Sequence, residues 1–186
     1  MAMAAAIPLG FRHPQAPETL ESKGRSFPRG RISEIVGVRS SGRTSALCDL
    51  LAASTGRGEF AALVDSADAF DPVSAAAVGV DLTRLVWVRC GGNAEHALRA
   101  ADLLIHAGGF GVVALDLAEA SVAALNRIPV TAWFRFRRAI EATPTILTVL
   151  ADRPLAKSCS SMTLKLSPRR AVFTGRAPFL LLRDAG

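Results

Sequence analysis

From Arg31 onward the chain alternates between short apolar runs and segments in which apolar residues recur at helical spacing. The apolar runs are nearly continuous, which is typical of strands buried on both faces of a parallel sheet. They read "RISEIVG", "EFAALVD", "RLVWVR", "GVVALDL" and "TILTVLA". The helical segments between them read "TSALCDLLAAST", "DPVSAAAVGV", "NAEHALRAADLLIHAGG" and "VTAWFRFRRAIEA". This alternation predicts an α/β fold with a mostly parallel sheet flanked by helices.

Both ends of the chain depart from this pattern. Residues 1–30 mix prolines with polar residues and show no sustained periodicity, so we expect a flexible or loosely docked N-terminal arm. Residues 31–186 are expected to form the core domain. After Asp152 the segments "SMTLKL", "AVFTG" and "PFLLLRD" are separated by Pro or Gly, which predicts antiparallel strands added to the sheet as a C-terminal extension.

The segment "GVRSSGRTS", residues 37–45, is close to the phosphate-binding pattern G-x-x-x-x-G-K-[ST]. It follows a predicted strand and precedes a predicted helix, where backbone N–H groups and the helix dipole favour bound phosphate. Arg43 stands where the pattern has lysine. The residues expected to hold a nucleotide are Gly37, Val38, Arg39, Ser40, Ser41, Gly42, Arg43, Thr44 and Ser45. The alternative is a Gly- and Ser-rich turn kept for packing.

A second signature follows the loop in the order expected of nucleotide hydrolases. The strand "GVVALDL" ends in Asp116, as does the strand whose aspartate helps to hold magnesium in such enzymes. If a nucleotide binds, the Thr44 hydroxyl and Asp116 are the predicted magnesium ligands, with ATP as the cofactor.

Composition and charge narrow the possible functions. A chain of 186 residues, half of them hydrophobic, suits one globular domain with a full core. No apolar run approaches the roughly 18 residues that a membrane-spanning helix needs. Three scattered cysteines without metal-ligand spacing indicate idle thiols in the cytoplasm. The net charge of +6 is concentrated at the two ends, around a slightly acidic middle. Such ends attract nucleic acid or acidic proteins, or are simply solvated.

Several basic residues are candidates for contact with nucleic acid or a protein partner. In "WFRFRRAIEA", Trp133 and Phe136 share one face, while Arg135 and Arg138 lie on the other. A core helix with a solvated basic face explains this pattern equally well. The remaining candidates are Arg153, Lys157, Arg169 and Arg170.

Three stretches resemble the RecA recombinases: "PRGRISEIVGVRSSGRTS", "ALVDSADAFDPVSAAAVGVDLTRLVWVR" and "EHALRAADLLIHAGGFGVVALDL". The resemblance covers roughly residues 27–117 and implies a RecA-like fold, ATP with magnesium, and DNA. The segments "GVDLTRLVWVR" and "SMTLKLSPRRAVF" also resemble ImuA, a shorter RecA-related partner of bacterial error-prone polymerases.

The departures from RecA bear on catalysis. The family's glutamate that activates water falls on Ala67, whose methyl group cannot act as a base. Asp68 is next to it and is a weak candidate for the role. The Asn-Gln pair that ends a later strand in RecA reads Ala151-Asp152 here, and the loop after it, "RPLAKSCSS", is short. Arg43 keeps the charge of the lysine but is bulkier and planar.

The sequence therefore favours a RecA-like protein of the DNA-damage (SOS) response with a degenerate nucleotide site. It would act as a cytoplasmic adaptor in DNA repair or translesion synthesis, with an error-prone polymerase as partner and DNA bound through its basic ends. The alternative is an ATP-dependent recombinase-like ATPase that binds single-stranded DNA. The role in damage response comes from the resemblance alone.

Overall fold

The computed structural model describes residues 18–168, 172–176 and 179–183. Six parallel strands form the centre of the fold: β3 (Ile32–Gly37), β4 (Phe60–Asp65), β5 (Leu85–Arg89), β6 (Phe110–Asp116), β7 (Ile146–Ala151) and β8 (Ser160–Leu166). Their order in the sheet is β5-β4-β6-β7-β3-β8. The five apolar runs predicted as strands are all present, and the α/β fold is confirmed.

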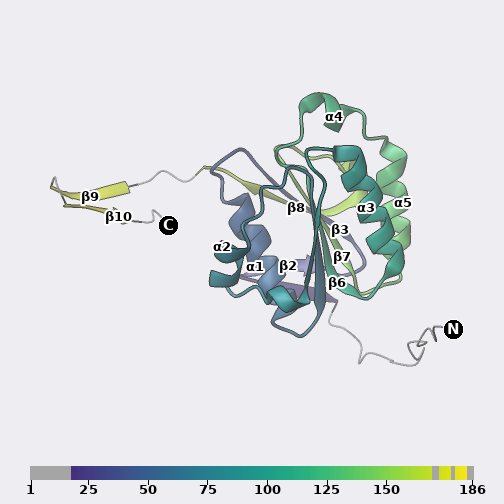
Figure 1. Ribbon diagram of the computed structural model, residues 1–186, viewed down its shortest axis with the longest axis horizontal. Coiled ribbons are helices and arrows are strands. Elements are labelled where there is room, and N and C mark those ends of the chain that lie inside the picture. The colour runs from purple at the N-terminus through teal and green to yellow at the C-terminus, as the bar shows by residue number, and fades with distance from the viewer. Residues whose placement is uncertain (1–17, 169–171, 177–178, 184–186) are drawn as a thin grey trace.

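Helices cover both faces of this sheet (Figure 1). On one face lie α1 (Arg43–Thr55) and α2 (Pro72–Ala77), and on the other lie α3 (Ala94–Ala107), α4 (Val122–Asn126) and α5 (Val130–Ile140). Short 3₁₀ turns occur at Leu82–Arg84 and Lys157–Cys159. Within the described ranges, no helix is long and apolar enough to span a bilayer.

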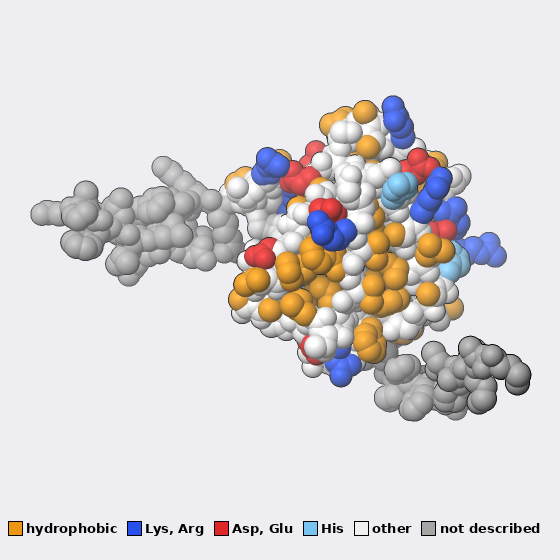
Figure 2. All heavy atoms as spheres, in the orientation of Figure 1, with side chains coloured by type: hydrophobic (Ala, Val, Ile, Leu, Met, Phe, Trp, Pro, Cys, Tyr) orange, Lys and Arg blue, Asp and Glu red, His pale blue; other side chains and the backbone are white. Residues whose placement is uncertain are grey.

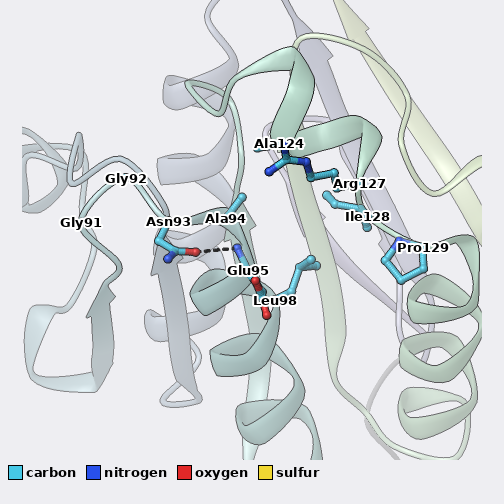
Figure 3. A pocket seen from close by; sticks show the side chains of 10 residues that line it. All are labelled: Gly91, Gly92, Asn93, Ala94, Glu95, Leu98, Ala124, Arg127, Ile128 and Pro129. Atoms are coloured by element: carbon cyan, nitrogen blue, oxygen red, sulfur yellow. Dashed lines mark hydrogen bonds between the residues drawn. The ribbon is translucent and has the colours of Figure 1, made fainter.

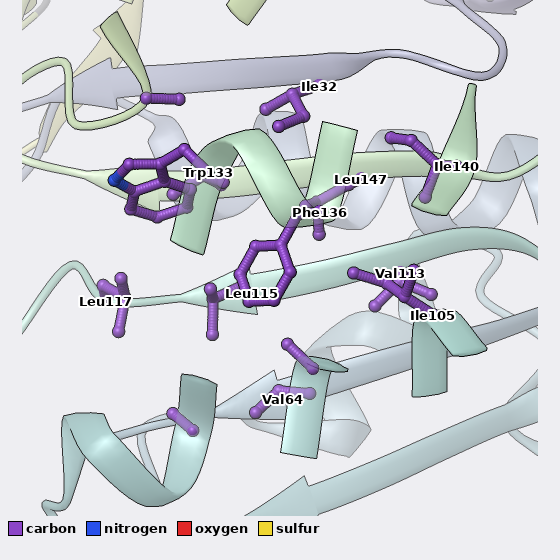
Figure 4. Packing of buried hydrophobic residues seen from close by; sticks show 14 of the residues in the cluster. Ile32, Val64, Ile105, Val113, Leu115, Leu117, Trp133, Phe136, Ile140 and Leu147 are labelled. Carbon is purple, nitrogen blue, oxygen red and sulfur yellow. The ribbon is translucent and has the colours of Figure 1, made fainter. Parts of the chain in front are cut away.

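Each face of the sheet has its own hydrophobic core. The larger side chains of one core come from α5, where Trp133, Phe136 and Ile140 are almost fully buried. Phe136 lies over Leu115 and Leu147 of the neighbouring strands β6 and β7 (Figure 4), and all of these residues belong to one cluster. The apolar stripe predicted for this helix is therefore its core face, and its arginines are on the outside. The second core lies between the sheet and α1.

Residues 18–30, which the sequence placed in an N-terminal arm, contain two strands that the sequence analysis missed. β1 (Thr19–Ser22) and β2 (Arg25–Pro28) pair as an antiparallel hairpin. Leu20 and Phe27 face each other across it and are 0% and 1% exposed, in the same core as α1. This part of the segment is therefore folded, while residues 1–17 lie outside the described ranges. The domain boundary at residue 30 stays a prediction.

The C-terminal extension differs from the prediction in two respects. "SMTLKL" belongs to β8, which pairs with β3 in parallel, not antiparallel, orientation. The reason is topological: β7 already has β6 and β3 on its two sides, so the chain must cross over β3 to reach the sheet edge. β9 (Val172–Arg176) and β10 (Phe179–Arg183) are antiparallel to each other, as predicted, but form a separate two-stranded sheet.

Candidate functional site

The phosphate-loop segment joins the fully buried strand β3 to the start of α1, as the sequence predicted. Gly42 precedes the helix with φ of +85°, in the left-handed region that glycine adopts without strain. A Cβ at Gly37 would collide with the Ser41 side chain and lie 2.9 Å from the Leu166 carbonyl oxygen. Both glycines are therefore needed for the turn itself, whatever the loop binds.

Arg43, the residue in the lysine position, is turned into the protein. Its residue surface is only 6% exposed. One terminal nitrogen donates to the Gly37 carbonyl oxygen at 2.6 Å. The side chain of Arg43 therefore reaches back across the loop to the loop's first residue. The other donates to Glu119 Oε1 at 2.6 Å and to the Ala118 carbonyl oxygen at 3.3 Å. Arg43 is therefore neutralised and hydrogen-bonded by its own chain.

Glu119 is the acidic partner of this loop, and the sequence analysis did not identify it. It follows β6 by three residues and reaches Arg39 as well as Arg43, with 3.1 Å between Arg39 Nε and its Oε2. The hydrogen bond from Arg39 lowers the pKa of Glu119, and the two positive charges add to that effect. One carboxylate thus pairs with both arginines of the loop. An acidic residue soon after Asp116 was the only available signal.

Asp116 lies at the end of β6, beside the loop. Burial raises the pKa of its carboxyl to about 6. The hydrogen bond from the Ala118 N–H, 2.9 Å long, works against this rise, whereas the charge of Asp65 on the neighbouring strand supports it. Thr44, its predicted partner in holding magnesium, is exposed on the first turn of α1. Magnesium binding by this pair stays a prediction that depends on a bound nucleotide.

ATP with magnesium does not fit these residues as they are arranged. A triphosphate needs an available cation in the loop, but Arg43 already has three acceptors, one of which is the carboxylate of Glu119. A phosphate approaching the loop would meet the negative charge of Glu119, and like charges disfavour each other. In the part of the chain that the structure describes, no cluster of three metal-binding side chains offers another cation site.

The segment after β4 contains Ala67, the position at which RecA has its catalytic glutamate. Asp65 is 1% exposed and fastens this segment by accepting hydrogen bonds from the backbone N–H groups of Ala67, Ala69 and Phe70. Ala67 is exposed and has no group that could take a proton. Asp68 has φ of +58°, and its carboxylate accepts from Arg89 at 3.1 Å and from the Gly91 N–H at 3.3 Å. Asp68, the weak candidate for the base, is thus engaged elsewhere.

The predicted basic contact residues come from two neighbouring elements. Arg135 and Arg138 are exposed on α5, although Arg135 pairs with Asp102 of α3 at 3.1 Å. Lys157 is exposed at the start of a 3₁₀ turn that contacts α5, and Arg153 precedes it in the same connection. Figure 2 shows Lys and Arg side chains gathered along the side formed by α3 and α5. Arg169 and Arg170 lie outside the described residues.

A buried carboxylate holds the basic loop after β7. Glu34 of β3 is 2% exposed, and its Oε1 accepts from the N–H groups of Leu155 and Ala156 at 2.6 and 2.9 Å. Glu34 lies three residues before Gly37, so the strand that leads into the phosphate loop also anchors the loop of Arg153 and Lys157. The sequence analysis missed this role, because a glutamate in an apolar strand gives no indication of its partner.

A pocket of about 750 Å³ lies between the start of α3 and the connection from α4 to α5 (Figure 3). This volume lies within the range of small-molecule sites. Two of the polar side chains that line it, Asn93 and Glu95, are already used, however. The Asn93 side chain caps α3 by accepting from the Glu95 and His96 N–H groups, and Glu95 pairs with Arg99 at 2.7 Å. We assign no ligand to this pocket.

Comparison with known proteins places this geometry in context. Residues 21–130 match the RecA N-terminal domain family. The chain is 45% identical over 100 residues to Protein RecA of Methylococcus capsulatus, a match that covers 54% of this chain and 27% of that protein. Protein RecA of Borreliella afzelii is 41% identical over 100 residues, covering 54% and 26%. The chain thus matches about a quarter of the length of these curated relatives.

The fold is also similar to that in a crystal structure of the RadB recombinase. The TM-score is 0.59 at 16% sequence identity, and the match covers 77% of each chain. At this identity the likeness concerns the fold alone.

Proposed function

The chain belongs to the RecA family, since its match to the RecA N-terminal domain covers more than half of its length, and from this premise we propose that it acts by binding and not by hydrolysing a nucleotide. In this proposal it is a cytoplasmic adaptor of the DNA-damage response. Its partners are an error-prone, translesion-type polymerase and DNA.

The proposal rests on one observation: the residues that would catalyse ATP hydrolysis are either missing or engaged with other groups. Ala67 has no proton-accepting group, and Asp68 is held by Arg89 and Gly91. General-base catalysis typically contributes about 10²–10⁴-fold to a rate. Without this contribution, and with Arg43 engaged by Glu119, fast hydrolysis has no support in the site.

The DNA part of the proposal is supported by the exposed Arg138 and Lys157 beside the loop that Glu34 anchors. Phosphate contacts from Arg and Lys supply most of the sequence-independent affinity for nucleic acid. The polymerase part is supported only by the resemblance of "GVDLTRLVWVR" and "SMTLKLSPRRAVF" to ImuA.

Phosphate release by the purified 186-residue chain tests the first part. We expect ATP hydrolysis at the background rate, with and without single-stranded DNA. A rate that rises several-fold when single-stranded DNA is added would overturn the proposal. Co-elution with an error-prone polymerase in size-exclusion chromatography tests the adaptor role, with a replicative polymerase as the control for specificity.

One observation favours a second candidate, an ATP-dependent ATPase that binds single-stranded DNA. The strand, loop and helix keep the geometry of a phosphate loop, and Thr44 is exposed on the first turn of α1. The same assay separates the two candidates, because only the ATPase releases phosphate in response to DNA.

A further inference from the structure

We infer that Glu119 is the resident anion of the phosphate loop: its carboxylate takes the place of a bound phosphate group and determines that the site rejects nucleoside triphosphates. This inference deepens the proposed function and rests on it, because a loop that is filled by its own chain has no use for a nucleotide.

The first support is that both terminal nitrogens of Arg43 are engaged. Its guanidinium is buried, and three acceptors surround it: the Gly37 and Ala118 carbonyl oxygens and Glu119 Oε1. A guanidinium in this arrangement is fixed by the geometry of its fork. A phosphate could use the terminal nitrogen that faces Glu119 only after displacing this carboxylate.

The second support is that Glu119 bridges the two cations of the loop. Arg39 pairs mainly with Oε2 and also reaches Oε1 at 3.4 Å, while Arg43 pairs with Oε1, so one carboxylate serves both arginines. The side chain of Arg39 is 82% exposed, whereas that of Arg43 is 7% exposed. Because surface pairs are weak and buried charges require a partner, the pair with Arg43 is the decisive one.

The third support is a polar group that the loop leaves unused. The Ser41 hydroxyl is buried at 6% residue exposure and has no hydrogen-bond partner in the structure. Buried hydroxyls are normally satisfied. This hydroxyl lies in the turn between Gly37 and Arg43, packed against Gly37, so the loop keeps a polar group that its own residues do not satisfy.

The test removes the charge of Glu119 and keeps its shape. The variant Glu119→Gln is compared with the unchanged chain and with Glu141→Gln, which removes a more exposed glutamate that pairs with Arg31. Each protein is titrated with magnesium ATP and, separately, with inorganic tripolyphosphate, by isothermal calorimetry. Tripolyphosphate distinguishes recognition of phosphate from recognition of the nucleoside.

We expect the unchanged chain and Glu141→Gln to bind ATP with a Kd above about 1 mM, and Glu119→Gln to bind both ligands at least tenfold more tightly, since tenfold corresponds to about 1.4 kcal/mol. Equal affinities in Glu119→Gln and the unchanged chain would overturn the inference. A micromolar Kd for the unchanged chain would overturn it as well.

The double variant Arg43→Lys with Glu119→Ala provides a second measurement if Glu119→Gln does not unfold cooperatively. It replaces the pair with the lysine of the phosphate-loop pattern and removes the carboxylate. We expect it to bind tripolyphosphate at least tenfold more tightly than the unchanged chain, and an unchanged Kd would overturn the inference. Phosphate release is recorded separately: turnover by the unchanged chain contradicts the proposed function, whereas failure to gain binding contradicts only the role of Glu119.

Discussion

At the scale of single residues, the chemistry of the site follows from which charges are buried together. Arg43 is neutralised by Glu119, while Asp116 is buried next to Asp65 and keeps its proton more tightly than a free aspartate does. The sequence predicted Arg43 and Asp116 as site residues from their positions in known patterns. It did not predict Glu119, because a contact between positions 43 and 119 exists only after the sheet has brought the ends of β3 and β6 together.

The raised pKa of Asp116 predicts a pH-dependent cost of folding. In the unfolded chain the carboxyl titrates near 3.8, and in the folded chain near 6. The folded state therefore binds the proton more tightly, so this group makes the protein less stable as the pH rises from about 4 to 6. Asp116→Asn removes the charge, and the Asn carbonyl can still accept from the Ala118 N–H.

We expect Asp116→Asn to raise the free energy of unfolding at pH 7.5 by about 1–3 kcal/mol, since one unit of pKa shift corresponds to about 1.4 kcal/mol. Urea denaturation at pH 7.5 and at pH 4 measures the change. The gain should shrink toward zero at pH 4, where the folded state of the unchanged chain is protonated. A variant that is less stable at pH 7.5 would contradict this assignment.

At the scale of elements, the near-continuous apolar runs identified five strands, four of which are buried on both faces, while β5 is a partly exposed edge strand. The hairpin β1–β2 escaped prediction because only one residue of each strand, Leu20 and Phe27, is an apolar core residue. The direction of β8 escaped it because the alternation in "SMTLKL" indicates an edge strand but not its orientation. Orientation depends on the crossover over β3, which is a property of the sheet.

The hairpin is expected to be part of the cooperative fold. Leu20→Ala removes a fully buried side chain that packs with α1, so we expect a loss of about 2–5 kcal/mol in the free energy of unfolding. Leu103→Ala is the matched control, because Leu103 is 72% exposed. Thermal or urea unfolding measures both. Equal stabilities of the two variants would mean that the hairpin is not held by the core.

The anchoring of the loop after β7 leads to a proteolysis prediction. Glu34→Ala removes the acceptor of the Leu155 and Ala156 N–H groups, so residues 152–158 should open more often. We expect trypsin to cut after Lys157 at least several-fold faster than in the unchanged chain, with Arg153 protected by the following proline. Mass spectrometry identifies the cut. In the control Glu141→Ala the rate of cleavage after Lys157 should be unchanged. Equally fast cleavage in that control would contradict the prediction.

At the scale of the whole molecule, the fold and its family could be predicted from the sequence, whereas the partners could not. The match to the RecA N-terminal domain over residues 21–130 agrees with the resemblance seen in the motifs. The basic ends indicate attraction to polyanions. A net charge of +6 does not show, however, which surface of the protein would carry the contact residues. Only the fold shows that Arg138 and Lys157 come from elements in contact.

Binding to single-stranded DNA should therefore depend steeply on salt. The logarithm of the association constant is expected to fall linearly with the logarithm of the salt concentration, in proportion to the phosphates that the protein neutralises. Replacing Arg138 or Lys157 by Ala should reduce the slope by about 0.7 each, the value for one phosphate of a single strand. Fluorescence anisotropy with two unrelated oligonucleotides measures this, with Arg57→Ala as the control. Salt-independent binding would contradict the basic interface.

The pair of the buried Arg43 and the partly exposed Glu119 also constrains how this loop can change over generations. Replacing Glu119 alone by an apolar residue leaves a buried guanidinium without its countercharge, and replacing Arg43 alone by an apolar residue removes a partner that holds the loop closed. Both of these apolar replacements are costly, so a lineage that has acquired the pair returns to an open phosphate loop through a polar replacement of Glu119 or by altering both residues together. The pair therefore limits which substitutions can reopen the loop.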